Sequence, residues 1–144
     1  MTTHQTQSGI RNPVDEDRGG LLRLALKLDA AASGALGVLT LAASPMLVDL
    51  LGTPLALLVP VGLFLIVWAA ALWVIASRPR IGGAAVRAVI LLNLLYAVDG
   101  VLVVATGLFP LTALGTAFVL SQVVAVTFFA AAQFYALRKR DQLR

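Results

Sequence analysis

The 144-residue sequence contains no cysteine, which excludes disulfides, thiolate-bound metals, iron–sulfur clusters and cysteine nucleophiles. Its single histidine, His4, lies in a polar N-terminal segment, so the apolar part of the chain can form neither a histidine metal site nor a Ser-His-Asp triad. That part also lacks two acidic residues at one depth. We therefore expect no catalytic residues, no metal and no cofactor, and a protein that is not an enzyme.

Charge is scarce as well. Charged residues make up 12 % of the chain, about half of the roughly 25 % that is usual in soluble domains, whereas 60 % of the residues are hydrophobic. The net charge of +4 comes from basic residues that stand at the ends of apolar runs and form no continuous face, so we expect no nucleic-acid partner. The partner that this composition predicts is the lipid bilayer.

Four apolar runs are long enough to cross a bilayer, whose hydrocarbon core of about 30 Å needs about 20 helical residues. The expected helices cover about 21–43, 55–77, 84–107 and 111–137. Each connection contains Pro or Gly, as turns require. The sequence thus predicts an all-α membrane protein, built as an antiparallel bundle of four transmembrane helices.

The two ends of the chain are polar. Residues 1–18 are expected to form a disordered tail, because they hold no apolar run that would offset the entropy cost of ordering. We assign residues 19–140 to the membrane domain and 141–144 to a short cytoplasmic end. Asp15, Glu16 and Asp17 stand where a signal peptide would carry positive charge, so we expect no cleavable signal peptide.

The basic residues predict the orientation in the membrane. All 11 Lys and Arg lie before or within the first turns of the first helix, around the second connection, or at the C-terminal end. The first and third connections contain none. Because basic connections stay on the cytoplasmic side, we expect both termini and the second connection in the cytoplasm. The prediction is a multi-pass protein of the bacterial inner membrane, N-in and C-in.

Asp99 has the clearest functional implication, because it stands inside the third apolar run. It lies eight residues from the outer end of that run, which corresponds to about 12 Å at 1.5 Å per residue. A carboxylate at this depth is costly and should face the bundle or a wet cavity. Two interpretations stand: a proton or cation relay, or a neutral acid that fixes helix register by hydrogen bonds to Thr116 or Gln122 of the last helix.

Further polar residues share helix faces with this site. Asn93 and Tyr96 are neighbours at i and i+3 on the third helix. Gln122 and Gln133 stand 11 residues apart on one face of the last helix, which should point inward. Together these residues form a polar seam inside the bundle, which is either a pocket for a solute or lipid headgroup or a set of interhelical hydrogen bonds. The seam consists of Asn93, Tyr96, Asp99, Thr116 and Gln122. The first helix adds a polar stripe of Asp29, Ser33 and Thr40.

Two further contacts are predicted for the first helix. Asp29 and Arg87 both stand near the cytoplasmic ends of their helices, and we expect an ion pair between them. Small residues at four-residue spacing allow close helix contact, either within the chain, with a second copy or with another membrane protein. This small-residue face consists of Ala30, Ser33, Gly34 and Gly37.

The apolar region resembles small, uncharacterised four-helix integral membrane proteins of bacteria. The resemblance is carried by the segments LRLALKLDAAASGALG, LLGTPLALLVPVGLFL, ASRPR and FPLTALG, together with Asn93, Gln122 and Gln133. Helix count and size also make the chain distantly similar to DoxX-like four-helix proteins. These resemblances imply a four-helix membrane protein and assign a role to no residue.

Three functions are compatible with the sequence. An accessory or structural membrane subunit without catalysis is favoured, because the chain has packing faces and no catalytic constellation. A small-solute or proton-coupled carrier would use Asp99. A membrane enzyme acting on lipid or quinone is the least favoured, because it would need catalytic side chains gathered at one depth.

Overall fold

The structure is a computed structural model that describes residues 13–142, and over this range it contains helices and connections without a strand. Its elements are α1 (Pro13–Ala42), α2 (Ser44–Leu51), α3 (Leu55–Ser77), α4 (Gly83–Thr106) and α5 (Ala113–Gln142). All of them except the eight-residue α2 are long and apolar enough to span a membrane. The predicted all-helical class and the four long apolar helices are confirmed.

Glycine and proline determine where several helices end. α2 and α4 stop at Gly52 and Gly107, whose φ angles of 67° and 62° lie in the left-handed region that residues with a Cβ rarely adopt. α3 begins directly after Pro54, whose backbone is extended. The chain therefore turns sharply at residues that the sequence marks as breakers.

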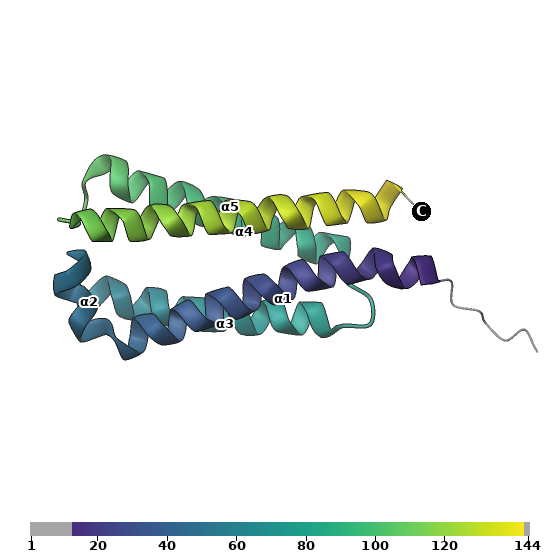
Figure 1. The fold of residues 1–144 in the computed structure, drawn as a ribbon, viewed down its shortest axis with the longest axis horizontal. Helices are drawn as coiled ribbons and strands as arrows, with labels where there is room; N and C mark the ends of the chain where they lie inside the picture. The colour runs from purple at the N-terminus through teal and green to yellow at the C-terminus, as the bar shows by residue number, and fades with distance from the viewer. Residues whose placement is uncertain (1–12, 143–144) are drawn as a thin grey trace, which may run out of the picture.

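The long helices run along the long axis of the molecule and pack mainly in two pairs (Figure 1). α1 packs against α3, α4 packs against α5, and α1 and α5 bring the two pairs together. The α3–α4 connection and the described ends of the chain lie at one end of the molecule, while α2 and the α4–α5 connection lie at the other (Figure 1). All connections are short, so residues at similar distances from one end become neighbours.

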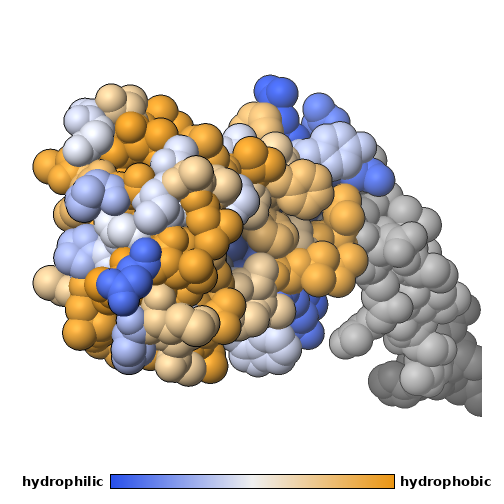
Figure 2. Space-filling model, turned by 60° about the vertical axis from the view of Figure 1, so that its left-hand side comes forward, coloured by the Kyte–Doolittle hydropathy of each residue, from blue (hydrophilic) through white to orange (hydrophobic). Residues whose placement is uncertain are grey.

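The outer surface of the helices is strongly apolar. Figure 2 shows hydrophobic residues over most of the visible face. On α4, for example, Leu91, Leu95 and Val98 are each more than half exposed. A surface of this kind is the reverse of what a domain in water presents, and it fits contact with lipid tails.

The chain departs from the predicted boundaries at the start of the first helix, in the first connection and at the end of the last helix, where α5 continues to Gln142 instead of ending at about 137. α1 begins at Pro13 instead of about 21, so residues 13–18, which we predicted to be disordered, are helical. The rest of the predicted tail, residues 1–12, lies outside the described residues, as do 143 and 144 of the predicted cytoplasmic end. The first connection is also largely helical, because Ser44–Leu51 forms α2 with a proline in its first turn, where a missing N–H costs nothing.

The small-residue face of α1 is covered by α3 of the same chain. A Cβ built on Gly37 would lie 2.8 Å from the backbone oxygen of Gly62, and one on Gly34 would lie 3.3 Å from the Cβ of Ala69. Ala30 and Ser33 on the same face are buried. The small-residue face therefore packs within the chain, against α3, which is one of the alternatives that the sequence left open.

At the end of the molecule opposite the chain termini, Thr112, which stands just before α5, connects α2 to α5. Its backbone N–H donates to Leu51 O at 3.1 Å and its hydroxyl to Leu50 O at 2.7 Å, so it caps the C-terminal carbonyls of α2. The same hydroxyl accepts the N–H of Gly115 at 3.0 Å and thereby caps the first turn of α5. One threonine thus fixes α2 against the start of α5.

Candidate functional site

The carboxyl group of Asp29 on α1 lies deep in the interior of the bundle, and the residue is only 1 % exposed. Asn93 Nδ2 of α4 and Gln133 Nε2 of α5 each donate to its Oδ2 at 2.8 Å. Ser33 Oγ, one turn further along α1, donates to its Oδ1 at 3.2 Å. We call these four residues the Asp29 network. It joins three helices through one carboxyl group.

The Asp29 network forms because its members stand at equal depth. Asp29 and Asn93 lie ten residues after the starts of their spans at Gly19 and Gly83, and Gln133 lies nine residues before the end of its span. The three donors give both carboxyl oxygens of Asp29 a hydrogen bond. A buried carboxyl group needs such partners, because burial removes its hydrogen bonds to water. The polar stripe of α1 is confirmed to face inward, since Thr40 is buried too, and so is the inward direction predicted for Gln133.

The predicted ion pair between Asp29 and Arg87 is wrong. Arg87 lies only four residues after Gly83, so its backbone is six residues, or about 9 Å, closer to the helix end than that of Asn93. Its side chain is 71 % exposed, and its Nη2 lies 3.9 Å from Asp141 Oδ2 on α5. Asp29 is instead held by neutral amides and a hydroxyl group.

One turn beyond Asn93 on α4, Tyr96 forms the second polar contact of the interior. Its hydroxyl donates to Gln122 Oε1 of α5 at 2.7 Å. Its ring is nearly parallel to that of Phe64 on α3, with centroids 6.4 Å apart, and Phe64 stacks in the same way on Trp68. This aromatic stack bridges α3 and α4.

Asp99 lies three residues further along α4 and lines a cavity of about 110 Å³. The cavity lies between α3, α4 and α5, Leu51 and Thr53 also line it, and its walls are mainly apolar. Tyr96 and Gln122 also line it. The side chain of Asp99 is exposed, and no hydrogen bond within residues 13–142 involves it.

Two contacts predicted for Asp99 are therefore absent from the described part of the chain. Gln122 lies beside Asp99 in the cavity, but its carbonyl oxygen is taken by Tyr96. Thr116 does not line the cavity, because it belongs to the first turn of α5, where its N–H donates to Thr112 O. The register-fixing role that the sequence offered to Asp99 is filled by Asp29.

A second, smaller cavity of about 20 Å³ lies next to the first. Ser33 and Asn93 of the Asp29 network line it together with Trp68 and Tyr96. Tyr96 lines both cavities. Polar groups therefore follow one another through the interior, from Asp99 through the Tyr96–Gln122 pair to the Asp29 network.

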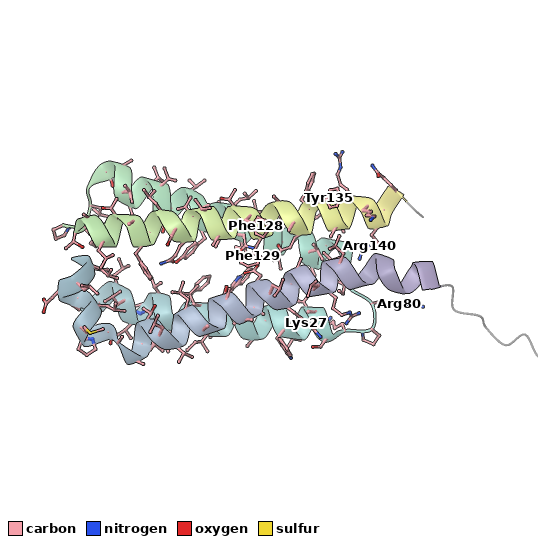
Figure 3. The ribbon with its side chains drawn as sticks, viewed as in Figure 1. Lys27, Arg80, Phe128, Phe129, Tyr135 and Arg140 are labelled. Carbon is pink, nitrogen blue, oxygen red and sulfur yellow. The ribbon has the colours of Figure 1, made fainter. Side chains whose placement is uncertain are left out.

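Basic side chains gather at the end of the molecule that holds the α3–α4 connection. Figure 3 shows Lys27, Arg80 and Arg140 in this region, which we call the basic end. Arg23 donates to the carbonyl oxygens of Ala76 and Arg78, and so caps the C-terminus of α3. Arg140 Nη1 donates to Ile81 O in the α3–α4 connection at 2.7 Å. Arg23 and Arg140 thus hold the α3–α4 connection in place by hydrogen bonds, in addition to giving this end of the molecule its positive charge.

Within the described residues no group of three His, Cys, Asp or Glu side chains is placed to hold a metal ion. Comparisons with protein-family models, with curated proteins and with solved structures give no match to this chain.

Proposed function

We propose that the protein spans the inner membrane of a bacterium as an antiparallel four-helix bundle, with both termini in the cytoplasm. The four long apolar helices support the multi-pass arrangement. The gathering of basic side chains at one end supports the orientation, because Lys and Arg stay on the cytoplasmic side. In this orientation Asp99 and its cavity open in the outer half of the membrane.

The function proposed for this bundle is the binding of a small solute beside Asp99, as in a carrier. One observation carries the proposal: a carboxyl group without a hydrogen-bond partner in the described chain lines a cavity with apolar walls. Such a group is costly at this depth unless a ligand or proton meets it. The matching solute has a cationic or hydrogen-bond-donating head and an apolar body. We assign the chain no catalytic step.

The interior beyond Asp99 supports movement of the solute or of a proton. Tyr96 and Gln122, which share a hydrogen bond, line the Asp99 cavity, and Tyr96 also lines the smaller cavity next to the Asp29 network. Opening the Tyr96–Gln122 hydrogen bond would join the two cavities. A carboxylate holds either a proton or a cationic solute, so competition at Asp99 supplies a simple means of coupling the two.

An accessory subunit without its own ligand is the second candidate. The Asp29 network favours it, because interior polar groups there are satisfied by one another and serve to fix three helices. In that case Asp99 would have no role in binding. The two candidates therefore differ in what the Asp99 cavity does.

Benzylammonium is a suitable probe, because its ammonium group matches the carboxylate and its ring matches the apolar walls of a cavity that is open at the exposed Asp99. We expect Asp99→Asn to weaken its binding at least tenfold, since a hydrogen bond to a charged group contributes about 1.5–3 kcal/mol. The measurement is calorimetric titration of the purified protein in mild detergent. Asp49→Asn is the matched control, because Asp49 is exposed on α2 and does not line the cavity.

Binding that survives Asp99→Asn, or that is lost equally in Asp49→Asn, would contradict the carrier proposal. If neither the wild type nor the control binds benzylammonium or other small amphipathic amines, the accessory function takes its place.

A further inference from the structure

A groove of about 580 Å³ runs between α4 and α5 at the basic end, far along the molecule from the Asp99 cavity. Its walls combine apolar and charged side chains. The residues used below are Arg87, Leu91 and Leu94 of α4, and Phe134, Arg138 and Asp141 of α5. The groove therefore has a charged end, which we call its mouth and which consists of Arg87, Arg138 and Asp141. The rest of its wall is apolar.

The charge at the mouth is positive. Arg87 and Arg138 come from the two facing helices, and the guanidinium of Arg138 lies over the ring of Phe134, 5.3 Å from its centroid. The one acidic residue, Asp141, lies 3.9 Å from Arg87 Nη2 and 3.5 Å from Arg140 Nε. Arg140 also neutralises part of the negative charge of Asp141. The mouth of the groove therefore keeps a net positive charge.

The apolar length of the groove is open to the side. Leu91 is 58 % exposed and Leu94 is 43 % exposed, and both lie on the exposed apolar surface of α4. Arg87 lies four residues after the start of its span, which places it about 6 Å from the helix end, at headgroup depth. An occupant must therefore carry an anionic group at the mouth and hydrocarbon along the leucines.

We propose that this groove binds an anionic phospholipid. Its phosphate lies between Arg87 and Arg138, since guanidinium groups pair with phosphate oxygens through two parallel hydrogen bonds. Its acyl chains follow Leu91, Leu94 and the ring of Phe134. The arginines of the groove thus select a lipid, in addition to marking the cytoplasmic side. This site is independent of solute binding at Asp99.

The test is lipid retention, measured by native mass spectrometry after the protein is reconstituted in bilayers of equal parts phosphatidylglycerol and phosphatidylcholine. We expect the wild type to retain phosphatidylglycerol preferentially. Removing each arginine should lower this preference about tenfold, because each removal loses a hydrogen bond to the charged phosphate, so Arg87→Gln with Arg138→Gln should lower it about 100-fold. The control pair, Arg80→Gln with Lys139→Gln, removes the same charge from the basic end without altering the groove.

Every outcome decides the proposal. It is supported if the groove pair loses the preference and the control pair keeps it, and if Arg87→Lys with Arg138→Lys, which retains the charge, falls between them. Equal loss in both glutamine pairs means general attraction to the basic end and overturns the site. Displacement of the lipid by inorganic phosphate at millimolar concentration means that the acyl chains add nothing, which overturns the lipid assignment.

Discussion

Replacing Asp29 with alanine is expected to lower the free energy of unfolding by about 2–4 kcal/mol. The substitution removes the acceptor of three hydrogen bonds. It leaves Gln133 Nε2 buried without a partner and Asn93 Nδ2 with only a 3.5 Å hydrogen bond to Gln133 Oε1. Two of the three bonds join different helices, and at the value of about 1–2 kcal/mol per interhelical hydrogen bond found in model transmembrane peptides they account for this total. The measurement is reversible unfolding in mixed micelles of increasing dodecyl sulfate content.

Asp29→Asn is the informative control for the Asp29 network. Its amide oxygen can accept from Asn93 and Gln133, while its NH₂ group donates to Ser33 Oγ. We expect this isosteric change to cost less than about 1 kcal/mol. An Asp29→Ala protein as stable as the wild type, or a loss in Asp29→Asn equal to that in Asp29→Ala, would show that the network does not hold α1, α4 and α5 together.

Gly115→Ala is expected to destabilise the protein by about 2–3 kcal/mol. A Cβ on Gly115 would overlap the backbone oxygen of Leu51, and a backbone atom at a helix end cannot move aside without shifting α2. That shift would also break the hydrogen bonds from Thr112 to Leu50 and Leu51. The same unfolding measurement in mixed micelles detects the loss.

The control for Gly115 is Gly82→Ala in the α3–α4 connection. A Cβ there meets no atom within 4 Å, and the φ of Gly82 is −68°, which alanine adopts readily. We expect a change within about 0.5 kcal/mol. Equal stability of the two variants would mean that α2 does not pack on α5 as closely as the structure has it.

The sequence predicted the long helices well because their signal is simple. Runs of about 20 apolar residues bounded by Gly, Pro and Arg place α3 and α4 within one residue of the observed bounds. The short α2 was missed, since eight residues between two turn signals carry no usable periodicity. Its position depends on capping by Thr112, which is 61 residues further along the chain than Leu51 and has no local signature.

The candidate site was predicted in part. Helical spacing correctly placed the stripe of α1 and Gln133 inside, because a face follows from periodicity alone. Spacing does not say which faces meet. Asp29 was therefore paired with Arg87, and Asp99 with Thr116 or Gln122, whereas Asp29 accepts hydrogen bonds from Asn93 and Gln133 and Asp99 lines a cavity. Counting depth from the helix ends would have matched Asp29 to Asn93 instead of Arg87.

Asp99 is proposed to belong to a ligand site that opens toward the outer side of the membrane. The chain has no cysteine, so one introduced thiol is the only reactive one. Val103→Cys places it in the cavity one turn from Asp99 and keeps the carboxylate, whereas Val98→Cys places it on the exposed apolar surface of α4. A thiol in contact with lipid stays protonated and unreactive toward a charged reagent.

The decisive measurement is the rate at which a membrane-impermeant trimethylammonium methanethiosulfonate, added to the outside of intact spheroplasts, labels these two variants. We predict that Val103→Cys is labelled, that benzylammonium slows its labelling, and that Val98→Cys is not labelled. Labelling of Val103→Cys only from the cytoplasmic side, no labelling at all, or a rate that benzylammonium leaves unchanged would contradict the account.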